Sequence, residues 1–176
     1  MSFVKPLPEE KAPAELKPIY ESMKQRFGKM PNFFGMMAHK PEVLKNFLPF
    51  YSAVTGPGSV EPKYKELAYL KTSIINGCEY CTKAHTASAR RIGITDEQIR
   101  ALVFYHRSKL FDEKEKAVIR FADQVTRASS TVCDEQLQEM GKYFSEEQIV
   151  ELVLTISVAN LTNRVNDSLL CDPDLG

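Results

Sequence analysis

The chain has 176 residues and a mass of 20.0 kDa, the size of one ordinary domain. Lys and Arg total 23 and Asp and Glu total 23, so the formal net charge is zero, which argues against a broad nucleic-acid-binding surface. Apolar residues make up 43% and charged residues 26%, which excludes a disordered composition.

The sequence contains no signal for export or for membrane insertion. The start, MSFVKPLPEEKAPAEL, lacks the continuous apolar core of a signal peptide, and no apolar run reaches the roughly 18–20 residues of a membrane-spanning helix. Four cysteines are too few to hold a chain of this size together by disulfides. We therefore expect a cytoplasmic protein with reduced thiols and with no membrane or nucleic-acid partner.

Helical periodicity recurs through the first half of the chain. Residues 14–27 place Leu16, Tyr20 and Met23 at intervals of three and four, which predicts one apolar helix face. Residues 41–54 and 61–75 predict two more helices, each with a proline at or near its first position. Pro49 is a candidate kink in the earlier of these two.

Helix starts with the spacing of capping boxes follow in the second half. A last, strongly apolar helix is expected over about residues 146–169, and no hairpin turn joins alternating apolar runs. The sequence therefore predicts an all-α, single-domain bundle of about eight helices over residues 1–176. The three capping boxes are Thr95-x-x-Gln98, Asp112-x-x-Glu115 and Ser145-x-x-Gln148.

Segment 66–85, ELAYLKTSIINGCEYCTKAH, holds the chemically informative residues. Asn76-Gly77 should end one helix, and the next should start near Cys78. At about 100° per residue, Cys81 and His85 return to within about 60° of Cys78, so the three side chains share one face. His85 can then accept the Cys81 proton, and Cys78 is near enough to form a disulfide. The helix N-terminus further favours a thiolate.

The C-x-x-C pair has two other interpretations. The cysteines can be two buried small apolar residues, or two ligands of a structural zinc whose fourth ligand would come from a scattered single: Cys133, Cys171, His39 or His106. Covalent haem attachment needs histidine directly after the second cysteine, where Thr82 stands, and a thioredoxin-like motif needs a βαβ pattern that is missing.

The pattern E-x11-C-x-x-C-x-x-x-H, formed by Glu66, Cys78, Cys81 and His85, resembles the alkylhydroperoxidase AhpD family of the carboxymuconolactone decarboxylase-like superfamily. The string INGCEYCTKAH and the following ITDEQI are typical of that family. The flanking segments MPNFFGMMAHKPEVLKNF and NRVNDSLL resemble its peroxidase-related members. The resemblance covers most of the chain, from about residue 15 to about residue 170.

This resemblance implies an all-helical homo-oligomer that reduces a peroxide substrate without haem, flavin or metal cofactor. By position, Cys81 would attack the peroxide and Cys78 would resolve the sulfenic acid to a disulfide. His85 would take the Cys81 proton, and Glu66 would orient His85. The helix dipole alone favours Cys78 as the thiolate, but the neighbouring histidine favours Cys81, and we follow the histidine. A dithiol or protein reductant is then the expected partner.

Some members of that family carry a histidine between the two cysteines, where this chain has Glu79-Tyr80. Tyr80 is no base near neutral pH, so a shorter proton relay is expected. Tyr69 is expected to pack, and the polar residues of 163–167 to cap their helix and contact a subunit. The apolar run 33–37 is expected to form core, an oligomer interface or an access channel.

Three functions of different classes follow from the sequence. The first is a thiol peroxidase or related dithiol oxidoreductase, and the second is a decarboxylase-like acid–base enzyme. The third is a non-catalytic metal-binding or interaction module. The cysteine pair favours the first, because decarboxylation proceeds without two redox thiols.

Overall fold

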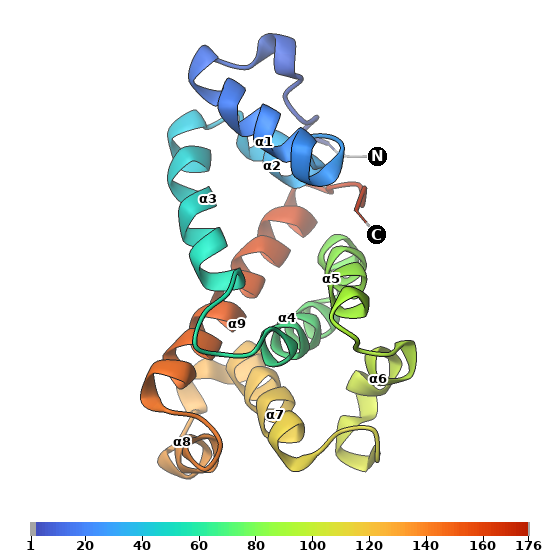
Figure 1. The fold of residues 1–176 in the computed structure, drawn as a ribbon, viewed down its shortest axis with the longest axis vertical. Helices are drawn as coiled ribbons and strands as arrows, with labels where there is room; N and C mark the ends of the chain where they lie inside the picture. The colour runs from blue at the N-terminus through green and yellow to red at the C-terminus, as the bar shows by residue number, and fades with distance from the viewer. Residues whose placement is uncertain (1–2, 176) are drawn as a thin grey trace.

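The computed structural model describes residues 3–175, and these form helices joined by short loops, with no strand in that range (Figure 1). The all-α prediction is confirmed. Residues 1–2 and 176 of the expected unit lie outside the described part. The α-helices are α1 (Lys17–Phe27), α2 (Asn32–Met37), α3 (Pro41–Thr55), α4 (Pro62–Asn76), α5 (Glu79–Arg91), α6 (Asp96–Ala101), α7 (Glu113–Ala128), α8 (Asp134–Gly141) and α9 (Glu146–Ser168). Short 3-10 helices cover Glu9–Lys11, Ala14–Leu16, Leu102–Arg107 and Ser129–Thr131.

All three predicted capping boxes are present. In each, the first side chain accepts from the backbone N–H three residues on, and the side chain of that later residue accepts from the first backbone N–H. Two N–H groups that the helix leaves unpaired are thereby satisfied. The pairs are Thr95 with Gln98, Asp112 with Glu115, and Ser145 with Gln148.

Two of the nine helices in the described range were not predicted individually. Helix α2 has six residues, of which Phe33, Phe34, Gly35 and Met36 are buried, so it shows no polar face. Helix α8 has eight residues and buries Met140 alone, so it shows no apolar stripe. Neither segment shows the 3.6-residue periodicity of apolar residues from which an amphipathic helix is predicted. Helix α3 continues through Pro49.

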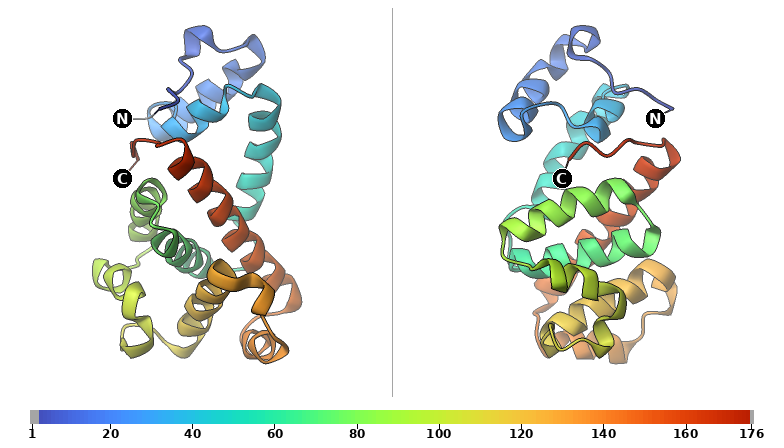
Figure 2. Two further views of the ribbon diagram at one scale, coloured as in Figure 1. Left: turned by 180° about the vertical axis from the view of Figure 1, so that it is seen from behind. Right: turned by 90° about the vertical axis from the view of Figure 1, so that its right-hand side faces the viewer.

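Helix α4 lies at the centre of the fold, in contact with α5, α7 and α9 (Figures 1 and 2). Tyr64 and Ala68 pack against α7 and α9, whereas Leu67 and Leu70 belong to a second apolar cluster with residues of α5, α6 and α7. In a helix buried on several sides, a polar side chain is costly unless it forms a hydrogen bond or an ion pair. Accordingly, the buried Lys65 pairs with a carboxylate of α9 and donates to Val54 O (3.0 Å) and Gly56 O (2.8 Å).

The N-terminal helices α1, α2 and α3 form a separate layer beside the C-terminal half of α9 (Figure 2). Their apolar side chains share one cluster with Tyr69 of α4, with Tyr80 and Cys81 of α5, and with Val158 and Ala159 of α9. The segment that carries the cysteines is therefore covered by residues of α1, α2 and α3, more than twenty positions earlier in the chain. Among the helices described, none combines the length and apolar character needed to cross a bilayer.

Candidate active site

The joint between α4 and α5 brings the motif residues together. Gly77 ends α4 with φ of 72°, in the left-handed region that glycine adopts without strain, and Cys78 is the N-cap of α5. The Cys78 N–H donates to Ser73 O at 3.0 Å, which closes the turn. Helix α5 then runs back along α4, as Figure 2 shows.

His85 is held by two residues of α4. Its Nδ1 lies 2.8 Å from Glu66 Oε2, and its side chain is 11% exposed. The Tyr69 ring stacks on the imidazole with centroids 3.4 Å apart and planes inclined by 13°. If Nδ1–H is donated to the carboxylate, Nε2 keeps its lone pair and can accept a proton. The structure thus brings Glu66 and His85 together across nineteen residues of sequence.

The two cysteines are free thiols and almost completely buried, at 0% exposed for Cys78 and 3% for Cys81. A hydrogen bond from the Cys78 thiol is the main reason that the pKa of Cys81 is lowered to about 6, and the nearby His85 adds to this against the opposing effect of burial. The same hydrogen bond and burial raise the pKa of Cys78 well above its usual range. The pKa of Cys81 thus lies below that of Cys78, and the Cys78 donor contributes more to this difference than His85 does.

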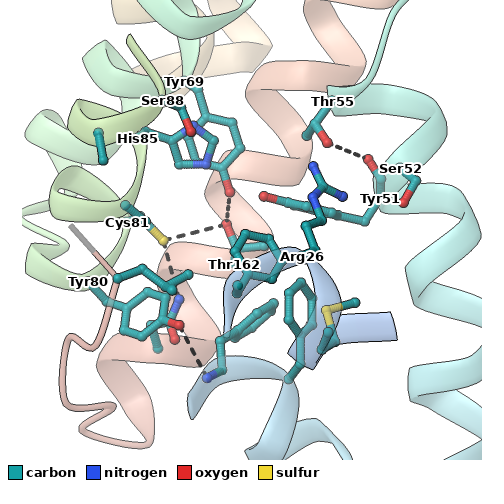
Figure 3. A pocket seen from close by; sticks show the side chains of 18 of the residues that line it. Arg26, Tyr51, Ser52, Thr55, Tyr69, Tyr80, Cys81, His85, Ser88 and Thr162 are labelled. Atoms are coloured by element: carbon teal, nitrogen blue, oxygen red, sulfur yellow. Dashed lines mark hydrogen bonds between the residues drawn. The ribbon is translucent and has the colours of Figure 1, made fainter. Parts of the chain in front are cut away.

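Helix α9 supplies further contacts to the Cys81 sulfur. The Asn166 Nδ2 donates to Cys81 Sγ at 3.2 Å, and the Thr162 hydroxyl lies 3.8 Å from the same sulfur (Figure 3). Thr162 also shares a hydrogen bond with the Tyr69 hydroxyl at 2.5 Å.

These contacts correct one expectation. Asn166 was assigned to helix capping and subunit contacts, but it is 1% exposed and faces the thiol. Tyr69 packs as expected, buried in the core with its ring stacked on the His85 imidazole. The available signal was the spacing of Thr162, Asn163 and Asn166, which places three polar groups on one side of an apolar helix.

Tyr80 has a structural partner away from the His85–Glu66 pair. Its hydroxyl accepts from the Phe33 N–H at 3.4 Å, at the start of α2. Burial, followed by the negative charge of Asp174, raises the pKa of Tyr80 above its ordinary value, so the phenol stays neutral. Tyr80 therefore joins α5 to α2 and to the C-terminal tail.

A cavity of about 320 Å³ opens onto Cys81 and His85. Most of its apolar lining, here called the apolar wall, comes from α1, α2 and α3, and most of its polar side chains come from α4, α5 and α9 (Figure 3). Phe33 and Phe34 of the apolar run are both core residues and part of this wall. The volume is that of a site for a small organic molecule. Its apolar lining residues are Met23, Phe27, Phe33, Phe34, Leu48, Ala84, Ala87 and Leu175.

The other two cysteines lie outside this cavity. Cys133 is exposed, and Cys171 is 8% exposed with its pKa raised to about 12 by burial and by the nearby Asp174 and Asp172 carboxylates. Over residues 3–175, no three side chains of the His, Cys, Asp and Glu types are grouped so that they could hold one metal ion.

Comparison with known proteins identifies the family of the chain. Residues 41–124 match the carboxymuconolactone decarboxylase family. The uncharacterized protein YdfG of Bacillus subtilis is 32% identical over 113 residues, which are 64% of this chain and 77% of YdfG. The chain belongs to the carboxymuconolactone decarboxylase family.

A shorter match is to the alkyl hydroperoxide reductase AhpD of Hyphomonas neptunium, 46% identical over 50 residues, which are 28% of either chain. Two solved structures share the fold over nearly the whole length. A peroxidase-related protein from Silicibacter has a TM-score of 0.87 at 24% identity, covering 98% of this chain and 93% of that one. The debrominase Bmp8 has a TM-score of 0.83 at 24% identity, covering 99% and 93%.

Proposed function

We propose that this member of the carboxymuconolactone decarboxylase family is a thiol-dependent peroxidase for hydrogen peroxide or organic hydroperoxides. Cys81 is the proposed nucleophile, Cys78 the resolving thiol, and His85 with Glu66 the proton relay. The observation that carries the proposal is the lowered pKa of Cys81, about 6, at a thiol that opens onto a cavity and has a second thiol as its donor. A low-pKa cysteine beside a resolving cysteine is the usual arrangement of peroxide-reactive thiols.

The first step is reduction of the peroxide by one thiolate. The Cys81 sulfur attacks one peroxide oxygen, the O–O bond breaks, and Cys81 becomes a sulfenic acid. The departing alkoxide takes the proton that His85 received from Cys81, so that an alcohol or water leaves. Glu66 stabilises the imidazolium in between, through the 2.8 Å contact with Nδ1.

The second step closes the disulfide. The Cys78 sulfur attacks the Cys81 sulfenic acid, and the hydroxyl leaves as water with the Cys78 proton. The i, i+3 spacing at the start of α5 keeps the two sulfurs adjacent. A dithiol or protein reductant then takes up the two oxidising equivalents. A cytoplasmic location, where such reductants are kept reduced, suits this cycle.

The deciding experiment measures consumption of cumene hydroperoxide with dithiothreitol as the reductant. The wild-type protein should turn the peroxide over, Cys81→Ser should not, and Cys133→Ser, a change at an exposed thiol, should match the wild type. Equal turnover by Cys81→Ser and wild type, or none by either, would contradict the proposal.

An acid–base reaction of the decarboxylase kind is the second candidate. The specific observation in its favour is the buried Glu66–His85 pair, which can move a proton without the thiols. A substrate whose conversion survives in Cys81→Ser but fails in His85→Asn would favour this candidate over the peroxidase.

We also propose that the protein is a homo-oligomer. Helix α9 leaves Val150, Leu154 and Leu161 exposed at 58%, 39% and 43%, four and seven residues apart. This spacing places them on neighbouring positions of one helix side, as an interface between helices requires. Sedimentation of a 20 kDa particle at micromolar concentration would contradict the proposal.

A further inference from the structure

Two arginines line the cavity, and neither has an acidic partner among residues 3–175. The Arg26 guanidinium, from α1, lies 5.1 Å from the centre of the Phe27 ring. Arg91, in the last turn of α5, donates from Nη2 to Ser88 Oγ at 2.8 Å. Arg90, its neighbour in the sequence, instead lies outside the cavity and pairs with Asp96 at 2.7 Å.

Among residues 3–175, the charged side chains that line the cavity therefore do not balance. Glu66 is the single acidic side chain among the lining residues, and its carboxylate is bound to His85. Arginine stays ionised at all physiological pH values, so two positive charges remain at the mouth. A guanidinium presents a planar set of N–H donors that matches the two oxygens of a carboxylate.

The position of Arg26 relates this charge to the thiol. Figure 3 shows Cys81 and His85 on one side of the pocket and Arg26 with Tyr51 on the other, with Thr162 between them. The apolar wall of α1, α2 and α3 lies along the same space. A molecule that reaches from Cys81 to Arg26 thus needs a reactive group at one end, an apolar body, and an anionic group at the other end.

We propose that the pocket binds apolar organic hydroperoxides that carry a carboxylate, with the peroxide at Cys81 and the carboxylate at Arg26 and Arg91. The inference rests on the proposed function for the identity of the reacting group. The carboxylate-binding part rests on the cavity, its apolar wall and its two arginines. Hydrogen peroxide fills little of a 320 Å³ space and offers nothing for the arginines to bind.

The test compares two hydroperoxides that differ only in the carboxylate. Cumene hydroperoxide and its para-carboxylated derivative carry the same peroxide on the same ring. The wild type should show a kcat/KM roughly two- to fivefold higher for the carboxylated probe, since Arg26 and Arg91 are exposed and an exposed Arg–carboxylate pair contributes on this smaller scale. Raising the salt concentration from about 20 to about 500 mM should reduce this preference, because exposed charges are screened.

Variants assign the preference to the arginines. Arg26→Gln and Arg91→Gln should each lower the ratio of kcat/KM between the two probes, the double variant should abolish it, and Arg26→Lys should retain part of it. Arg107→Gln is the matched control, because Arg107 is exposed and lies outside the cavity. A ratio near one in the wild type, or a ratio that the double variant leaves unchanged, would overturn the inference.

A binding measurement separates this inference from the peroxidase proposal. Calorimetry with 4-isopropylbenzoate and with its neutral amide needs no chemistry, so it can be done even if no peroxide is turned over. Tighter binding of the benzoate that disappears in the Arg26→Gln, Arg91→Gln double variant supports the carboxylate site whether or not Cys81 reduces peroxides. Equal binding of both ligands counts against the site, while turnover of cumene hydroperoxide would still support the peroxidase.

Discussion

Replacing Cys78 with alanine should raise the pKa of Cys81 and make that thiol less reactive at neutral pH. The hydrogen bond from Cys78 is the largest cause of the lowering of the Cys81 pKa from 9.0 to about 6. A hydrogen bond to an ionised group contributes about 1.5–3 kcal/mol, and one pKa unit corresponds to about 1.4 kcal/mol. Loss of this donor should therefore raise the pKa by roughly one to two units.

The consequence is a change in the fraction of thiolate. At pH 7 a group with a pKa of about 6 is about nine-tenths ionised, whereas a pKa of about 7 to 8 leaves roughly one-half to one-tenth ionised. Because the thiolate is the nucleophile, alkylation at pH 7 should slow by roughly two- to tenfold. Cys78→Ser should show a smaller effect, since the serine hydroxyl can still donate.

The assay is the rate of iodoacetamide modification of Cys81 between pH 5 and 10, followed by mass spectrometry of the peptide that contains it. Cys133→Ala is the control, because the exposed Cys133 is not in the cavity. A Cys78→Ala protein whose modification follows the same pH curve as the wild type would refute the assignment of Cys78 as the donor. His85 and the α9 side chains would then account for the lowered pKa.

Three further predictions follow from the same residues. Glu66→Gln and His85→Asn should each slow peroxide reduction by roughly 10- to 10⁴-fold, with the double variant little worse than either single one; wild-type turnover by Glu66→Gln from pH 6 to 9 would leave His85 acting alone. Mild peroxide should consume two of the four thiols with a mass loss of two hydrogens, and a product that carries only a sulfinic acid at Cys81 would contradict the disulfide. The wild type should gain stability relative to Cys81→Ser as pH rises from about 6 to 9, because the folded-state pKa of Cys81 is below the unfolded value and the folded thiol releases its proton first; parallel urea midpoints for both proteins across this range would contradict it.

Sequence reasoning could predict the helices whose boundaries are encoded locally. The capping boxes at Thr95, Asp112 and Ser145 and the left-handed residue Gly77 are determined within a few residues, and all four were predicted. The shared face of Cys78, Cys81 and His85 is likewise a property of one helix. The contact of His85 with Glu66 was predicted only on condition that α4 and α5 fold back on each other, which the structure shows.

The rest of the site depends on contacts between distant segments. Asn166 reaches Cys81 across 85 residues of sequence, and Thr162 reaches Tyr69 across 93. Such contacts depend on where α9 crosses α4 and α5, and no local pattern fixes where two helices cross. Nothing in the sequence singles out Arg26, because arginines are common on exposed helix faces. Its place in the cavity becomes visible only when the fold brings α1 close to the thiol.

The turn at Gly77 has a consequence for the length of helix α4. Gly77 lies eleven positions after Glu66, which is about three complete helical turns. The chain therefore leaves α4 on the same side as the Glu66 carboxylate, within about 20° around the helix axis. Inserting or deleting one residue between them would turn the exit by about 100° and direct α5 away from Glu66, although every motif side chain would still be present.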